Sequence, residues 1–485
     1  MKPRSAASAD SGDLFRAELA TILNPKHELI LLADRIDWSQ MDQRVAPLFA
    51  NEGRPATPTR LMVGLHYLKH AFDLSDEAVC TRWVENPYWQ FFCGERFLQH
   101  DPPIDPSGMT LWRKRVGTKV YKDMLELTLN MAVGFKLARP RDFEEVSVDT
   151  TVQEKNIAHP TDARLYDTGR RKLVAMATDR GIKLRQTYAR VGPADLQQHG
   201  RYCHAKQFKR ARKVRKRLKN YLGRTIRDLQ RQAERLKLKW SQDEAILIGR
   251  CLQVLLQGRG GPNKLYSLHE PEVQCIAKGK AHKRYEFGSK VGIVSTLRGN
   301  WISAAVAFEG NPYDGHTLSE SLCNANLLTG RWVKRAVVDK GYRKHDADWM
   351  VEHAGLDVLM PGQKKRGKLT RSLRKKLKRR NAVEPVIGHC KSDHRMGRCY
   401  LKGQLGDGLN ALGAAFGFNL RKVLKGLAGL ACAARIGTLR EASGCWSACC
   451  GLGASLGWLT AAVDQAAWAG IDAAGRWPQA IGTLA

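Results

Sequence analysis

This sequence shows no pattern of disulfide pairs, has few acidic residues and has no apolar segment at its start. The 12 cysteines of the 485-residue chain are irregularly spaced and include no CxxC pair. A chain of this length does not need disulfides, so we expect reduced thiols in a cytoplasmic protein. The first 15 residues contain no apolar core, which argues against a signal peptide.

Acidic residues are scarce, because 47 Asp and Glu stand against 80 Lys and Arg, a formal net charge of +33. This charge favours a polyanionic partner, most simply nucleic acid. Ribosomal and membrane-surface proteins share such a charge, but they rarely carry long apolar strand and helix patterns between the basic segments. The length predicts roughly two to four domains.

Charge is absent from residues 442–463. Their length is compatible with a membrane span, but their Gly, Ser and Cys content disfavours one. Residues 429–485 are rich in Ala, Gly and Trp, and we interpret them as a loosely packed C-terminal appendage.

Residues 21–138 follow a loose N-terminus, residues 1–20, and show the apolar spacing of helices. Ser75 and Ser107 are the predicted N-caps of two of these helices. The helix after Ser107 carries a basic cluster that is compatible with helix-turn-helix DNA binding: Arg113, Lys114 and Arg115. The alternative is a helical bundle whose basic residues only face solvent.

Residues 139–200 and 281–428 mix strand and helix patterns, so we predict an α/β domain in two parts. A basic helical insertion, residues 201–280, separates them. Ten of its positions 201–219 are Lys or Arg and none is acidic, which phosphate contacts explain better than a solvated helix. The predicted strands are residues 143–151, 285–296, 301–308, 335–339 and 356–360.

Three acids stand where a mixed sheet forms sites. Asp149 lies near the end of the first predicted strand, Asp339 ends a later one, and Glu384 lies on a helix beyond it. Strand-end carboxylates converge at one edge of an α/β sheet. Carboxylates suit Mg²⁺ or Mn²⁺, and two such ions about 4 Å apart can activate a water or a 3′ hydroxyl against a phosphodiester. The alternative for each aspartate alone is a turn or cap residue.

The helix predicted around Glu384 places one acid in a row of cations. Its face consists of Arg380, Glu384, Gly388 and Lys391, continued by Arg395 and Arg398. Such a row suits a carboxylate that holds a metal while its neighbours hold phosphates. The alternative is a capping box between Asn381 and Glu384. Residues 364–380, just before this helix, include eleven basic positions and no acid.

Two further features leave alternatives open. Thr317 and Glu320 form a predicted capping box, and the neighbouring Asp314 and His316 could join an active site, although turn chemistry explains them as well. A zinc site is conceivable but lacks a second tightly spaced pair; its ligands would be His389, Cys390, His394 and Cys399.

The stretches around the three acids resemble DDE transposases of bacterial insertion sequences, most closely the insertion sequence five group. The resemblance covers about residues 20–425 and is carried by VDTTVQEKNIAHPTDARL, FEGNPYDGHTL, VVDKGY and RNAVEPVIGHCKSDHRMGR. The last stretch fits the family signature of arginine, three residues, glutamate, six residues and lysine through Arg380, Glu384 and Lys391. Leu377 stands where a related pattern has a tyrosine. The segment PTRLMVGLHYLKHAFDLSDEAVCTRWVENPYWQFFCGE is similar to the family's helical N-terminal domain.

The resemblance implies an RNase H-like mixed sheet with helices, preceded by an all-α domain and interrupted by the basic insertion. It implies a transposase, an endonuclease of DNA recombination that cleaves at the ends of an insertion sequence and joins the 3′ hydroxyls to target DNA. Two Mg²⁺ ions, for which Mn²⁺ can substitute, would be held by Asp149, Asp339 and Glu384. Arg380, Lys391 and Arg395 would contact DNA.

The implied partners are double-stranded DNA, as terminal inverted repeats and target, and a second copy of the chain in a homodimer on that DNA. No membrane partner is expected, and the location would be cytoplasmic and nucleoid-associated. Two alternatives remain open: a catalytically inactive or repurposed DNA-binding protein derived from a transposase, and an RNase H-like nuclease without strand transfer.

Overall fold

The computed structural model describes residues 17–53, 55–258, 261, 263–277, 284–362 and 370–450, with side chains to residue 429. The chain divides into two compact units, Met1–Lys425 and Gly426–Ala485. Helix α16 (Gly403–Cys450) crosses that division. Most of the predicted loose N-terminus, residues 451–485 of the predicted appendage, and positions 364–369 of the basic run lie outside the described residues.

The N-terminal region is helical, as predicted. Its elements are α1 (Leu19–Ile22), α2 (Glu28–Ala33), α3 (Trp38–Val45), η1 (Ala46–Leu48), α4 (Thr59–Ala71), α5 (Asp76–Glu85), α6 (Pro87–Phe92) and α7 (Pro106–Gly134). The Ser75 hydroxyl accepts a hydrogen bond from the Ala78 N–H at 3.0 Å, so the predicted cap of α5 is confirmed. The predicted Ser107 cap is wrong: Asp105 caps α7 and accepts from the Ser107 N–H at 2.8 Å, because Pro106 at the first helical position moves the start forward.

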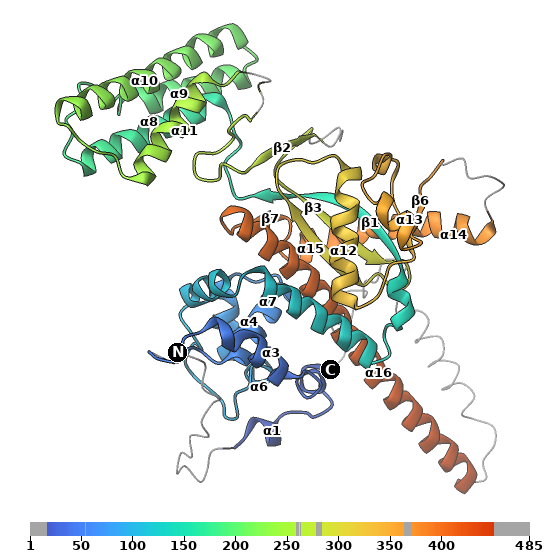
Figure 1. The fold of residues 1–485 in the computed structure, drawn as a ribbon. Helices are drawn as coiled ribbons and strands as arrows, with labels where there is room; N and C mark the ends of the chain where they lie inside the picture. Colours follow the sequence, from blue (N-terminus) through green and yellow to red (C-terminus); the bar gives the residue numbers. More distant parts are fainter. Residues whose placement is uncertain are drawn as a thin grey trace. The chain divides into compact units, whose positions relative to one another are not determined.

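The second region contains a mixed sheet in the order β2–β3–β1–β5–β6, with β4 also on β3 and β7 also on β1 (Figure 1). β1 pairs antiparallel with β3 and parallel with β5 and β7; β3 pairs antiparallel with β2 and β4. This arrangement confirms the predicted RNase H-like mixed sheet. The strands are β1 (Glu145–Lys155), β2 (Gln274–Ala277), β3 (Tyr285–Thr296), β4 (Ile302–Phe308), β5 (Arg335–Val337), β6 (Asp357–Leu359) and β7 (Arg398–Cys399).

The β3–β4 connection is the predicted hairpin. Gly299 and Asn300 have φ of 80° and 53° in its turn, a left-handed conformation that these two residue types adopt most readily. Gly288 is required at the crossing of β3 and β1, since a Cβ there would lie 1.9 Å from the Gln153 carbonyl oxygen. The hairpin with β4 and the close approach to β1 place β3 at the centre of the antiparallel strands of the sheet.

β1 runs four residues beyond its predicted end. The polar side chains of Gln153 and Lys155 concealed this extension in the sequence, but both are buried. Lys155 Nζ lies 3.0 Å from a carboxylate oxygen of Glu270 and 3.0 Å from one of Asp407. Buried charges persist when they are paired and hydrogen-bonded, so distant acids allow β1 to continue into the core.

The insertion is a helical bundle of α8 (Asp162–Asp179), α9 (Val191–His204), α10 (Phe208–Arg235) and α11 (Gln242–Leu256) (Figure 1). α8, α10 and α11 share one apolar core that includes Leu173, Leu222 and Cys251. All ten basic residues between positions 201 and 219 are exposed, while Ala211, Val214 and Leu218 on the same helix are buried. α8 lies before the predicted start of the insertion at residue 201, but it shares the core of the insertion's helices. This favours an insertion that begins before α8, and the boundary at residue 200 remains a prediction.

The remaining elements surround the sheet. They are η2 (Pro140–Glu144), η3 (Asp314–Thr317), α12 (Leu318–Thr329), η4 (Lys340–Tyr342), α13 (Asp348–His353), α14 (Arg371–Arg379), η5 (Arg380–Ala382) and α15 (Val383–Asp393). The predicted Thr317–Glu320 capping box is wrong, because the Thr317 hydroxyl donates back to the Asp314 carbonyl at 2.6 Å and closes η3. Within the described residues, no helix has the length and apolarity needed to cross a membrane.

Candidate active site

Asp149 lies in β1 and Asp339 lies just after β5, the parallel strand beside it. The β1–β5 ladder pairs Glu145 with Arg335 and continues to Ser147 and Val337. Asp149 and Asp339 each follow this last pair by two residues. At that point β5 has ended, whereas β1 continues toward β7. Neighbouring strands lie about 4.8 Å apart, and residues two apart point to the same face, so the register brings these carboxylates toward one another.

The carboxylates of both aspartates bind the backbone that follows them. Asp149 accepts a hydrogen bond from the Thr150 N–H at 2.8 Å and is half-buried within β1. Asp339 accepts from the Lys340 N–H at 2.5 Å and caps η4, with its side chain exposed. Each acid is thereby oriented at the rim of the sheet.

Asp314 is a third acid at this edge, held by residues from two strands. One of its oxygens lies 2.9 Å from Lys290 Nζ of β3 and 2.8 Å from the Thr150 hydroxyl of β1. The other lies 3.4 Å from a Cβ built on Gly341, two residues after Asp339. The sequence analysis left open whether Asp314 is an active-site residue or a turn residue, and it did not indicate Lys290. A lysine among the apolar residues of β3 was the available signal.

The pKa of the Tyr342 phenol is affected by all three of these acids. Tyr342 is 1% exposed and belongs to η4. Its pKa is raised well above the ordinary range by burial and then by the negative charges of Asp149, Asp314 and Asp339. All three carboxylates therefore lie near enough to this buried phenol to act on its charge.

Glu384 lies on α15, as predicted, and this helix contacts β1. Its side chain is 66% exposed and lies 3.7 Å from an Arg380 guanidinium nitrogen. Neither side-chain capping of α15 nor the alternative Asn381 capping box is present. Across the described part of the chain, no group of three His, Cys, Asp or Glu side chains is already arranged to hold a metal ion.

The donor chemistry of the site fits a hard divalent cation. Asp149, Asp339 and Glu384 offer carboxylate oxygens, the ligands that Mg²⁺ prefers. Mg²⁺ needs only one or two protein carboxylates besides water and substrate phosphate. The two aspartates supply that number of carboxylates, while Glu384 stands on α15, which contacts β1.

The predicted row of cations on α15 is shorter than expected. Arg380 precedes the helix in η5, and Lys391 occupies its last turn. Arg395 and Arg398 do not continue this face, because the helix ends at Asp393 and Arg395 has φ of 66°. Arg395 instead donates to the Asp73 carbonyl at 3.4 Å and lies 5.6 Å from the Tyr400 ring.

The basic cluster on α7 separates into one buried and two exposed residues. Arg113 is 3% exposed and donates to both oxygens of Asp76, at 2.9 and 2.6 Å. Lys114 and Arg115 are exposed. Arg113 is therefore withdrawn from the predicted DNA contacts, since its guanidinium already binds a carboxylate inside the protein.

The side chains of the alternative zinc site have other partners. His389 pairs with Asp393 at 2.8 Å, and His394 is buried with Nδ1 2.8 Å from the His70 carbonyl. Burial raises the pKa of the Cys390 thiol, which disfavours the thiolate that zinc requires. The described residues give this alternative no support.

Comparison with known families matches two segments of the chain. The family described as Transposase domain (DUF772) matches residues 17–115, and the Transposase DDE domain matches residues 266–420. The second match contains Asp314, Asp339 and Glu384, whereas Asp149 lies between the two. A protein of Rhizobium meliloti, "Uncharacterized protein ORF8 in nfe locus", is 51% identical over 208 residues, 43% of this chain and 100% of that protein. No solved structure gives a significant match.

A helical domain before an RNase H-like sheet that gathers acids at one edge defines a class of enzymes that act on nucleic acid phosphodiesters. With both transposase matches in chain order, the protein belongs to the DDE transposases of insertion sequences.

Proposed function

We propose that this transposase binds the ends of an insertion sequence of the insertion sequence five group, cleaves phosphodiester bonds there and joins the 3′ hydroxyls to target DNA. The observation that supports the proposal is the β1–β5 register, because Asp149 and Asp339 each follow its last pair, Ser147 and Val337, by two residues. Turn or cap chemistry alone gives no reason for two acids to follow the same pair at the same spacing.

Asp149, Asp339 and Glu384 would hold two Mg²⁺ ions, for which Mn²⁺ can substitute. Bound there, the ions would activate the attacking water or 3′ hydroxyl and stabilise the leaving oxygen. The chain's own contribution is orientation: backbone N–H groups fix both aspartates, and Lys290 neutralises Asp314 beside them. Glu384 would leave its contact with Arg380 to complete the set.

DNA would follow the exposed basic surfaces. The exposed cations are the ten between positions 201 and 219 and Lys114 and Arg115 on α7, and the partly buried Arg380 and Lys391 at α15 would join them. A Cβ built on Gly388 meets no atom within 4 Å, so this face of α15 is open to an approaching backbone. We propose that the chain acts as a homodimer on paired terminal repeats, in association with the nucleoid.

The test is Mg²⁺-dependent nicking of a duplex that carries the terminal repeats, comparing the wild-type chain with Asp149→Asn. Asp348→Asn is the matched control, because its side chain is 78% exposed and it removes the same charge near the same sheet. Nicking lost in Asp149→Asn and retained in Asp348→Asn is expected. Cleavage by all three proteins, or by none, would refute the catalytic assignment, and joined products separate a transposase from a simple nuclease.

One observation favours the alternative of a DNA-binding protein without catalysis. Glu384 pairs with Arg380, and no three-carboxylate metal group is preassembled among the described residues. If this alternative holds, the Asp149→Asn and wild-type proteins bind the same duplex equally well and neither nicks it.

A further inference from the structure

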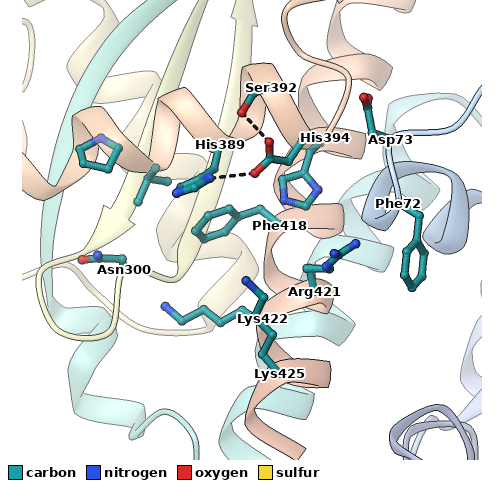
Figure 2. Close-up of a pocket in the computed structure, with 13 residues that line it drawn as sticks. Phe72, Asp73, Asn300, His389, Ser392, His394, Phe418, Arg421, Lys422 and Lys425 are labelled. Carbon is teal, nitrogen blue, oxygen red and sulfur yellow. Dashed lines mark hydrogen bonds and ion pairs between the residues drawn. The ribbon is translucent and has the colours of Figure 1, made fainter. Parts of the chain in front are cut away.

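A cavity of about 590 Å³ lies beside α15, and no step proposed above uses it. Three segments distant in sequence form it: Phe72 and Asp73 after α4, residues 385–394 around α15, and residues 418–425 of α16. Asn300 of the β3–β4 turn completes the wall (Figure 2). Its volume falls within the range of about 300–1,000 Å³ that is usual for small-molecule sites.

Three cations of α16 line this cavity: Arg421, Lys422 and Lys425 (Figure 2). Within the described residues, none of the three forms an ion pair with a carboxylate. Arg421 donates to the Ala71 carbonyl at 3.1 Å and lies 4.9 Å from the Phe72 ring. Arg421 and Lys425 are exposed and Lys422 is partly buried, so an anion that enters the cavity can reach all three cations.

The two acids of the cavity do not neutralise these cations. Asp393 is engaged on α15, 2.8 Å from His389 and 2.6 Å from the Ser392 hydroxyl (Figure 2). Burial raises the pKa of Asp73, and within the described residues it forms no ion pair with any of the three cations. The cationic side of the cavity is therefore left for a ligand.

Of the three cations, Lys422 lies in the surroundings that least favour its charged form. Its Nζ lies 4.6 Å from the Trp301 ring and 5.9 Å from that of Phe418. Burial and then the positive charge of Arg379 lower its pKa to about 8. An anion placed in the cavity would offset both effects and restore the ammonium form.

We propose that this cavity is a subsite for one phosphodiester group of a DNA strand, bound by Arg421, Lys422 and Lys425. The inference rests on the proposed function in requiring DNA as the ligand. Pro385, which follows Glu384 in α15, lines the cavity, and so do Phe72 and Asp73 of the N-terminal region. A strand held here would therefore run between the helical and catalytic parts of the chain.

Site-specific lysine labelling tests the proposal without any need for cleavage. The full chain is pulsed with acetic anhydride alone, with a 20-nucleotide single strand, with the corresponding duplex, or with inorganic phosphate, and each lysine is read by mass spectrometry. Lys422 and Lys425 should be protected several-fold by DNA and weakly by phosphate, while the exposed Lys136 is unchanged. Protection of lysines 209–219 without protection of Lys422 would overturn the subsite.

Charge variants give the second readout. Lys425→Gln and Lys422→Met should each lower the slope of log affinity against log salt by about 1, the loss of one phosphate contact, whereas Lys136→Gln should leave it unchanged. Equal salt slopes in all proteins would overturn the proposal. It would also be overturned if Lys425→Gln kept the wild-type slope and a thermal melt showed that Lys422→Met had lost DNA affinity because it unfolds. Asp149→Asn should keep full protection of Lys422, so failed cleavage and a failed subsite give different results.

Discussion

Replacing Arg113 with Met is expected to destabilise the N-terminal helices and to leave DNA binding unchanged. Arg113 donates to Asp76 at 2.9 and 2.6 Å, and Lys69 donates to the same carboxylate at 2.7 Å. The Lys69 and Asp76 side chains are largely buried as well. Methionine keeps much of the volume of Arg113 but removes the charge and the hydrogen bonds.

The size of the effect follows from this burial. Removing one partner of a buried ion pair costs roughly 3–5 kcal/mol because the other charge is left uncompensated. Lys69 still neutralises Asp76 in the variant, so we expect the lower end, about 3 kcal/mol.

The pH dependence has a definite sign. Burial alone would raise the pKa of Asp76, but the hydrogen bonds from Arg113 and the charge of Lys69 lower it below its ordinary value. A lowered carboxyl pKa stabilises the fold above the unfolded value of about 3.9 and loses this contribution as pH falls through the folded value. The difference between wild type and Arg113→Met should therefore be full at pH 7 and shrink below about pH 4.

Urea unfolding followed by tryptophan fluorescence measures the effect, because Trp83 and Trp112 are buried in these helices. Lys114→Met is the matched control: its side chain is exposed on the next position of α7. The control should keep the unfolding midpoint and bind DNA more weakly. The reasoning fails if Arg113→Met keeps the wild-type midpoint and loses DNA affinity as Lys114→Met does.

The other predictions concern the site, the core and the charge. Asp314→Asn should lower cleavage by about tenfold or more, a loss of roughly 1.4 kcal/mol of transition-state stabilisation, with DNA affinity unchanged in a binding titration; unchanged cleavage would remove Asp314 from the site. Lys155→Met should lower the free energy of unfolding by about 3–5 kcal/mol, since Glu270 and Asp407 lose their cation; an unchanged urea midpoint would contradict this. DNA affinity should fall steeply with salt, and a flat response would exclude phosphate contacts by residues 201–219. Because the pKa of Lys422 is about 8, affinity should also fall as pH rises through 8, and Lys422→Arg should abolish that fall.

Local patterns carried much of the fold. The alternation of β3, the Gly299–Asn300 turn and the Ser75 cap were predictable because each depends on neighbouring residues only. The helix around Glu384 was predictable for the same reason. Asp149 and Asp339 were selected because each lies near the end of a predicted strand, and the family motifs supported that selection.

The sequence was least informative where a charge is buried. Arg113 appeared to be part of an exposed basic cluster, and Lys155 appeared to lie beyond the end of β1. Their partners are 37 residues away in one case, Asp76, and more than 100 in the other, Glu270 and Asp407. Nothing in the local pattern distinguishes a solvated cation from one with such a partner.

By itself the sequence predicted most helices and strands and the excess of positive charge, and it proposed three acids for the site. Only the tertiary structure decided that Asp149 and Asp339 follow the same pair of the β1–β5 ladder, that Lys290 pairs with Asp314, and that three cations of α16 line a cavity beside α15. The physical reason is that secondary structure follows from interactions within a few residues, whereas register, burial and the pairing of charges depend on which distant segments pack together.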